Sequence, residues 1–213
     1  MKLPEFFELF LYSLSAIFFV VDVFGVVPLF IAMTANDSRT KSRSMAARAC
    51  VTGAALLIFF ALFGGFVFKV MGVTLSAFRV AGGILLLITA LDMLKARQSE
   101  TRTSAEETKE GTQKEDIAIV PLAMPLLAGP GSIATVMVLM SRGPNAFVVA
   151  IPVVISIVIT FGISYAILRG AALVQRVLGS SGLAVLERVM GLLLGAIAVQ
   201  FIADGGRDLL LKA

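Results

Sequence analysis

The chain contains no histidine and no tryptophan, and it has a single cysteine, Cys50. Without histidine, zinc sites of the usual kind and serine–histidine–aspartate triads are excluded. A lone cysteine excludes a disulfide framework, and Cys50 lies at the start of an apolar stretch, where it is most simply a small core residue. We therefore expect no metal site, no cofactor and no enzymatic activity.

Charge is also scarce. Only 15% of the residues are charged and 58% are hydrophobic, with a mean hydropathy of +0.97, whereas soluble domains carry roughly 25% charged residues. This composition predicts an all-α membrane protein that crosses the bilayer several times. The formal net charge of +4 does not indicate nucleic-acid binding, because the basic residues are scattered through polar loops, as topology signals are.

The first long apolar stretch, residues 9–36, carries one charge, Asp22, near its middle. A continuous helix of this length would measure about 42 Å, against a hydrocarbon core of about 30 Å. Gly25 and Pro28 follow Asp22 closely and favour a break there, since glycine permits unwinding and proline cannot donate a helical hydrogen bond. A carboxylate at membrane depth is expensive and marks a functional site by default.

A second stretch, residues 117–141, has no charge and is interrupted near its centre by Pro125, Gly129, Pro130 and Gly131. Two apolar segments broken by glycine and proline, one in each half of a chain, are the best sequence indication of a transporter's binding site.

Four unbroken apolar segments complete the pattern. They are Ala49–Val70, Ala77–Leu94, Ala146–Leu168 and Arg188–Ala203. Polar loops are expected at Asn36–Arg48 and Arg169–Glu187. The domain organisation that follows is a first three-helix repeat at residues 1–94, a polar cytoplasmic linker at 95–116, and a second three-helix repeat at 117–213.

The two halves share a weak internal repeat. Arg79-Val80-Ala81-Gly82 matches Arg188-Val189-Met190-Gly191, and an apolar run follows each. Since each half has three spans, an odd number, the second half enters the membrane inverted. We therefore expect six transmembrane segments as two inverted three-helix repeats, with segments 1 and 4 broken at glycine or proline. The Gly191-x-x-x-Gly195 pattern predicts close helix packing within the bundle.

The basic residues predict the orientation. Twelve of the 18 lysines and arginines fall in alternate loops, which the positive-inside rule places in the cytoplasm. Both termini are then expected outside the cytoplasm, in a multi-pass protein of the cell (inner) membrane.

In an inverted repeat the two broken helices approach one another near the midplane. Half-helix N-termini, expected after Gly25 and after Gly131, would suit a substrate carboxylate, while unwound carbonyls would suit an ammonium group or cation. Asp22 is a candidate ligand for a substrate ammonium, a proton carrier or a cation site. Its alternatives are an N-cap for the second half-helix or a buried partner for Arg79 or Arg188.

The remaining candidate substrate-binding residues carry small or hydroxyl side chains. Gly25, Gly129 and Gly131 would let a solute approach the backbone, or would serve helix packing alone. Ser132 and Thr135 would hydrogen-bond a substrate, or would satisfy a carbonyl one turn back.

Several motifs in both halves resemble the MarC family of integral membrane proteins, which includes small-neutral-amino-acid transporters. They are Asp22-Val-Phe-Gly25-Val-Val-Pro28-Leu-Phe30, Gly82-Gly83-Ile84, Val120-Pro-Leu-Ala-Met-Pro125-Leu-Leu-Ala-Gly129-Pro-Gly131 and Leu186-Glu-Arg188-Val-Met-Gly191-Leu. Val23 and Val26 stand where members often have proline and asparagine. The resemblance implies six spans and, for some members, transport of glycine or alanine with proton coupling as an option.

Our leading hypothesis is therefore a secondary transporter of a small polar solute, foremost a small neutral amino acid. The chain has no Walker A motif, so transport driven by its own ATP hydrolysis is excluded. A passive channel or permease and a non-transporting membrane scaffold stay as alternatives. The expected partners are the small-molecule substrate and the lipid bilayer, without nucleic acid; a homo-oligomer is left open.

Overall fold

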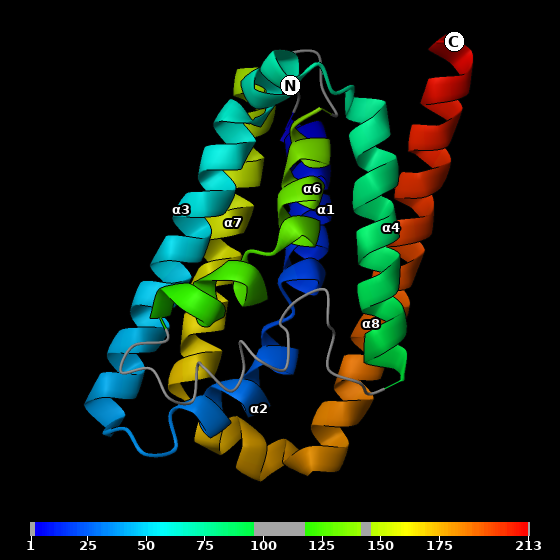
Figure 1. Cartoon of the computed structure of the whole chain (residues 1–213). Helices are drawn as coiled ribbons and strands as arrows, with labels where there is room; N and C mark the ends of the chain where they lie inside the picture. Colours follow the sequence, from blue (N-terminus) through cyan, green and yellow to red (C-terminus); the bar gives the residue numbers. More distant parts are fainter. Residues whose placement is uncertain (1–2, 96–117, 142–145, 213) are drawn as a thin grey trace.

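The computed structural model describes residues 3–95, 118–141 and 146–212, and Figure 1 shows its helices. These residues form helical elements only, with no β-strand among them. The elements are α1 (Leu3–Val21), α2 (Val23–Met33), α3 (Arg39–Met71), α4 (Leu75–Leu94), η1 (Ala118–Leu127), α6 (Pro130–Met140), α7 (Ala146–Arg169) and α8 (Ala171–Lys212). The predicted all-α class is confirmed for this part of the chain. Apart from Lys95, the linker predicted at 95–116 lies outside the described residues.

Among the described residues, five helical stretches are long and apolar enough to cross a membrane. They are Glu5–Met33, which joins α1 and α2, Arg39–Val70, Leu75–Leu94, Val148–Arg169 and Ser181–Leu211. A membrane protein with several spans is therefore supported. The fourth predicted segment, residues 117–141, contains only the shorter elements η1 and α6, of 10 and 11 residues, so a sixth crossing does not follow from helix length.

Two predicted loops are largely helical. The loop expected at Asn36–Arg48 was wrong beyond Ser38, because α3 begins at Arg39 and the Ser38 hydroxyl accepts a hydrogen bond from the Lys41 amide at 3.2 Å. A side-chain cap of this kind satisfies an amide that has no partner within the helix. The helix therefore starts well before the apolar run that the sequence pattern identifies.

The loop expected at Arg169–Glu187 was also wrong. α8 begins at Ala171 and continues to Lys212, interrupted only by Gly179, at φ 64° and ψ 178°. Hydropathy detects the part of a helix that lies in lipid, whereas alanine, leucine, glutamine and arginine extend a helix equally well in water or at the interface. The boundaries of α3 and α8 therefore exceed the apolar segments.

The helices form two groups that α6 and α2 connect (Figure 1). α7 packs against both α1 and α3, while α4 and α8 pack along one another in opposite directions. α6 contacts α1, α3, α4 and α7, so it lies in the interior of the bundle. α1 begins and α8 ends at the same end of the molecule, which an even number of crossings would produce.

Glycines allow α4 and α8 to approach very closely. A Cβ added at Gly83 would lie 2.9 Å from the carbonyl oxygen of Ala198, and one at Gly191 would lie 3.1 Å from that of Ala90. No larger side chain fits such distances without a shift of the partner backbone. The close packing predicted for Gly191 is confirmed; Gly195 makes ordinary contact, its added Cβ being 3.6 Å from the Cβ of Ala90.

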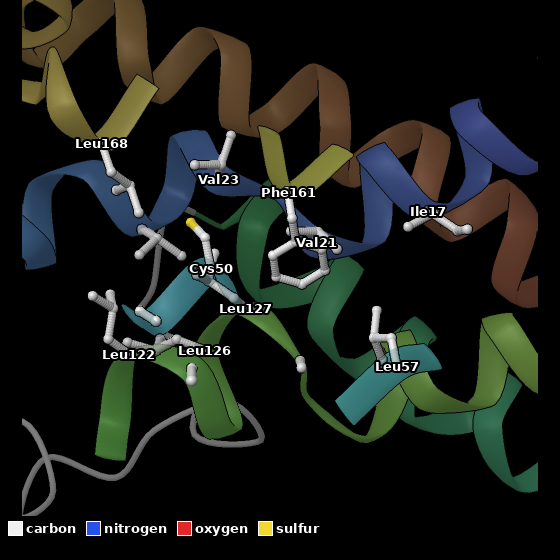
Figure 2. Packing of buried hydrophobic residues seen from close by; sticks show 14 of the residues in the cluster. Ile17, Val21, Val23, Cys50, Leu57, Leu122, Leu126, Leu127, Phe161 and Leu168 are labelled. Atoms are coloured by element: carbon white, nitrogen blue, oxygen red, sulfur yellow. The ribbon is translucent and has the colours of Figure 1, made fainter. Parts of the chain in front are cut away.

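The larger hydrophobic cluster surrounds both places where the helices are interrupted. Figure 2 shows Val21 and Val23, from the two sides of Asp22, together with Cys50, Leu127 and Phe161. All five side chains are at most 4% exposed. Cys50 is thus a core residue, as expected, and the polar groups at the interruptions are embedded in apolar surroundings.

Candidate solute site at two interrupted helices

The first interruption is a single residue, Asp22. Its amide still donates to the Phe18 carbonyl at 3.2 Å, so α1 retains its hydrogen bonding up to this point. Asp22 itself has φ 46° and ψ 58°, and it is the only non-glycine residue with positive φ in the described part of the chain. This left-handed conformation costs roughly 1–2 kcal/mol for an L-residue, although Asp and Asn tolerate it best.

The Asp22 side chain caps α2. Its Oδ1 accepts from the Gly25 amide at 3.4 Å, and the side chain is fully buried. A Cβ at Gly25 would lie only 2.5 Å from Asp22 Oδ2, so glycine is what lets the carboxylate lie across the first turn. Asp22 is therefore the N-cap of α2, which is one of the alternatives given above for this residue.

The expected break at Gly25 and Pro28 lies earlier. α2 begins at Val23 and runs through both residues, so its N-terminus precedes Gly25 rather than following it. Pro28 lies inside the helix and removes one internal donor, which a membrane helix tolerates when neighbouring groups compensate. The physical reason for the earlier start is that Asp22 supplies both the turn and the cap.

The second interruption is longer and differently built. Within η1, Val120 (φ −125°, ψ 123°) and Met124 (φ −132°, ψ 124°) are extended rather than helical. Each precedes a proline, and a following proline disfavours the helical conformation through steric contact with its ring. Ala128 and Gly129 then separate η1 from α6, which begins at Pro130 rather than after Gly131.

The N-terminus of α6 has no side-chain cap. Gly129, with φ −79° and ψ 176°, occupies the N-cap position, and it has no side chain that could accept a hydrogen bond. Pro130 at the first helical position lacks an amide hydrogen, and proline is favoured there for that reason. The next amides, those of Gly131 and Ser132, therefore have no capping side chain and lie at the positive end of the helix dipole.

The two hydroxyl candidates bond locally. Thr135 Oγ1 donates to the Gly131 carbonyl at 2.9 Å, and Ser132 Oγ donates to the Leu127 carbonyl at 3.4 Å, across the interruption. Both side chains are buried. Thr135 thus satisfies a carbonyl one turn back, the alternative stated for it above, while Ser132 joins the two sides of the break.

Gly131 brings the two interruptions together. A Cβ added there would lie 2.6 Å from Leu86 Cδ2 and 3.8 Å from Val20 Cγ1. Val20 is two residues before Asp22, so the first turn of α6 packs against the last turn of α1. Of the six candidates, Asp22 and Gly25 directly follow the α1 side of this junction in the chain, and Gly129, Gly131, Ser132 and Thr135 lie at the start of its α6 side.

Arg79, suggested above as a partner of Asp22, has other partners. Its Nη1 lies 3.1 Å from Asp208 Oδ2 and its Nη2 donates to Ser141 Oγ at 3.0 Å. These contacts tie the start of α4 to the end of α8 and to the C-terminus of α6. The last apolar segment predicted from the sequence ends at Ala203, before Asp208, whereas α8 continues to Lys212.

A row of buried hydroxyls on α7 was missed. Ser156, Thr160 and Ser164 are fully buried, and their spacing of four residues places them on one face of α7. Ser156 Oγ donates to the carbonyls of Pro152, at 2.7 Å, and Phe10, at 3.3 Å, which joins α7 to α1. Thr160, Ser164 and the α1 residue Ser13 have no hydroxyl partner among the described residues. The regular spacing within an uncharged span was the available signal.

A metal site has no support in the described residues, since no three His, Cys, Asp or Glu side chains gather there. What the junction offers is a carboxylate on one side and helix-terminal amides on the other, within an apolar cluster. Such a site can bind a small solute of mixed charge, and it contains no arrangement of nucleophile and base.

Comparison with known proteins gives one consistent result. The family model described as MarC family integral membrane protein matches residues 7–210. A UPF0056 membrane protein of Methanocaldococcus jannaschii is 39% identical over 96% of this chain and 98% of its own. One of Aquifex aeolicus is 36% identical over 98% and 97%, and YvbG of Bacillus subtilis, also a UPF0056 membrane protein, is 33% identical over 89% and 90%. No solved structure matches the chain.

Proposed function

The chain belongs to the MarC family of integral membrane proteins, and on that premise we propose that it is a secondary transporter of a small neutral amino acid such as glycine or alanine. The observation that carries the proposal is the fully buried carboxylate of Asp22, two residues after Val20, against which the uncapped first turn of α6 packs through Gly131. Buried ionisable residues within membrane segments mark solute or ion pathways.

An amino-acid zwitterion complements both sides of this junction. Its ammonium group would pair with the Asp22 carboxylate, and its carboxylate would accept from the amides of Gly131 and Ser132 at the positive end of α6. Both charges would thereby be neutralised away from water. Asp22 and Leu86 already fill the space beside Gly25 and Gly131, and this tight packing favours solutes with small side chains.

We propose further that the chain is an inverted repeat of two three-helix units. In it α1 and α2 correspond to η1 and α6, α3 to α7, and α4 to α8. The packing supports this correspondence: α3 contacts α7 and α4 contacts α8, and two further contacts each have an equivalent, α1 with α7 matching η1 with α3, and α2 with α8 matching α6 with α4. In such a transporter the substrate site lies at the interface of the repeats.

The proposed orientation in the cell membrane places the end where α3 begins and α7 ends in the cytoplasm, with both termini outside. It is supported by Arg39, Arg43, Arg169 and Arg176, which the fold gathers at that end. Transport is driven by an ion or proton gradient or by exchange. Asp22 is the group that would carry the proton.

Counterflow in proteoliposomes tests the proposal. Vesicles holding the wild-type protein are preloaded with unlabelled glycine, alanine or serine, and entry of the labelled amino acid is followed. Transient accumulation is expected, because a carrier exchanges solutes across a single site. Conductance far above carrier rates without counterflow would instead favour a channel. Absence of any amino-acid flux would favour the scaffold or another solute.

Matched variants place the site. Asp22→Asn, which keeps the size and capping ability of the side chain, is expected to abolish counterflow of a zwitterion. Asp92→Asn, a carboxylate at the end of α4, is the control and is expected to retain it. Counterflow by Asp22→Asn at the wild-type rate would show that the site lies elsewhere. Uptake driven by a pH gradient, measured beside counterflow, separates loss of proton coupling from loss of substrate binding.

A further inference from the structure

A pocket of about 510 Å³ lies at the end of the bundle where α2 ends, α3 begins and α7 meets α8. Four arginines line it, two from the first turns of α3 and two from the junction of α7 and α8: Arg39, Arg43, Arg169 and Arg176. They come from parts of the chain more than a hundred residues apart, so the fold rather than the local sequence concentrates the charge.

The positive charge of this pocket is not compensated within the described residues. The one acidic residue in the lining, Asp37, lies 2.7 Å from Lys41 and is paired with it. None of the four arginines has an ion pair in the described part of the chain. Two helices, α3 and α8, begin at the pocket and two, α2 and α7, end there, so their dipoles largely offset one another and the arginines supply the attraction for an anion.

The first part of α8 adds exposed apolar side chains beside the basic pocket. Residues 171–178 precede the Gly179 break and lie outside the candidate spans, which resume at Ser181. This segment runs across the end of the bundle, at a steep angle to the spans (Figure 1). Its Leu173 and Val177 side chains are 64% and 73% exposed, and Leu173 lines the pocket beside Arg176.

Exposed apolar side chains beside arginines, on a helix that lies across the ends of membrane spans, are typical of the lipid interface. Basic pockets between membrane helices bind phosphate-bearing headgroups, and arginine forms paired hydrogen bonds with phosphate. We propose that this pocket binds the phosphate of an anionic phospholipid headgroup, with the acyl chains lying along Leu173 and its neighbours. The apolar wall favours a lipid over free phosphate, which would leave Leu173 exposed.

Native mass spectrometry of the purified full chain in detergent tests this assignment. The protein is titrated with phosphatidylglycerol, with phosphatidylcholine, and separately with inorganic phosphate. Two double variants, Arg39→Gln/Arg43→Gln and Arg169→Gln/Arg176→Gln, each remove two pocket charges. The control, Lys95→Gln/Arg207→Gln, removes two exposed charges that do not line the pocket. Thermal unfolding of each variant checks that it is folded.

We expect the wild type to retain phosphatidylglycerol in preference to phosphatidylcholine, and each pocket variant to bind it about thirtyfold more weakly. The control should bind as the wild type does. Saturable binding of inorganic phosphate alone, lost in the pocket variants, would keep a phosphate site but overturn its assignment to lipid. Equal weakening of binding in the control and in the pocket variants would overturn the proposal, because general surface charge would then explain the binding. No preference for phosphatidylglycerol over phosphatidylcholine would overturn it as well.

Discussion

The two interruptions differ in how one helix ends and how the next helix begins. At the first, one residue in a left-handed conformation makes the turn and its carboxylate caps the next helix. At the second, two prolines hold the residues before them extended, and a glycine leaves the next helix uncapped. The difference gives the junction a negative group on one side and a positive helix end on the other. This difference in charge is what the proposed binding of a zwitterion requires.

The largest effect is expected from Asp22→Ala, which removes the cap and leaves an alanine in a left-handed conformation. Losing an N-cap costs about 0.5–2 kcal/mol and the strained backbone adds roughly 1 kcal/mol. The thermal unfolding midpoint in detergent should fall accordingly, and counterflow should be abolished. Asp22→Asn, which keeps the cap and tolerates the conformation, should lose counterflow with little change in stability. If both variants were equally destabilised, the capping role would be refuted.

A substantial effect is expected from Gly131→Leu, because the first turn of α6 lies against Leu86 and Val20. The added side chain would separate the two interruptions, and overpacking of this kind costs about 1–3 kcal/mol. The counterflow rate should fall by more than the loss of folded protein explains. Since the nearest atom is the flexible end of Leu86, the double variant Gly131→Ala/Leu86→Val should regain activity relative to Gly131→Ala. Gly162→Ala, whose added Cβ meets nothing within 4 Å, serves as the neutral control.

A moderate effect is expected from Gly129→Ser, which would make the second interruption resemble the first. A serine at the N-cap can accept from an amide in the first turn, which is worth about 1 kcal/mol. Relative to Gly129→Ala, the protein should be more stable but should bind its substrate more weakly, because the helix end is already satisfied. The measurements are thermal unfolding and the substrate concentration giving half-maximal uptake. A serine variant that binds as well as the alanine variant would argue against carboxylate recognition by α6.

The smallest effect is expected on the α7 hydroxyl row. Thr160→Val replaces a buried hydroxyl that has no partner in the described part of the chain, so stability should rise by about 1 kcal/mol, or about 2–4 °C in the unfolding midpoint. Ser156→Ala removes a hydroxyl that lies within hydrogen-bond distance of two carbonyls, and this change should lower the stability by a similar amount. Transport that falls in Thr160→Val without loss of stability would instead indicate that the row contacts the solute.

Sequence reasoning located the two interruptions but not their geometry. A carboxylate in an apolar run and clustered prolines are visible in the sequence, and the helix turns beside them, the last of α1 and the first of α6, pack against one another. That the six candidate residues form one substrate site stays a prediction. The predicted helix starts were too late, because Asp22 and Gly129 occupy the N-cap positions, and the backbone conformation that defines an N-cap is not visible in the sequence. Helix α3 and the first part of α8 were cut short because hydropathy ends at the lipid boundary.

Other features depend on contacts that no sequence pattern contains. The spacing of Ser156, Thr160 and Ser164 was visible, but whether that face meets lipid or another helix follows only from the packing of α7 on α1. The arginine pocket joins residues 39 and 176, which only the fold makes neighbours. The sequence suggested Asp22 as a partner of Arg79, and only the length of α8 brings Asp208 to Arg79 instead.

The contact between α4 and α8 limits how such a protein can move. Where Gly83 and Gly191 admit the backbone of the other helix, a slide by one turn would drive larger side chains into a gap that has no room for a methyl group. The two helices can therefore translate or tilt together but cannot shear past one another. If the proposed transporter works by alternating access, α4 and α8 would move as one rigid unit. Bending of the backbone would then occur at the helix interruptions at Asp22 and Gly129.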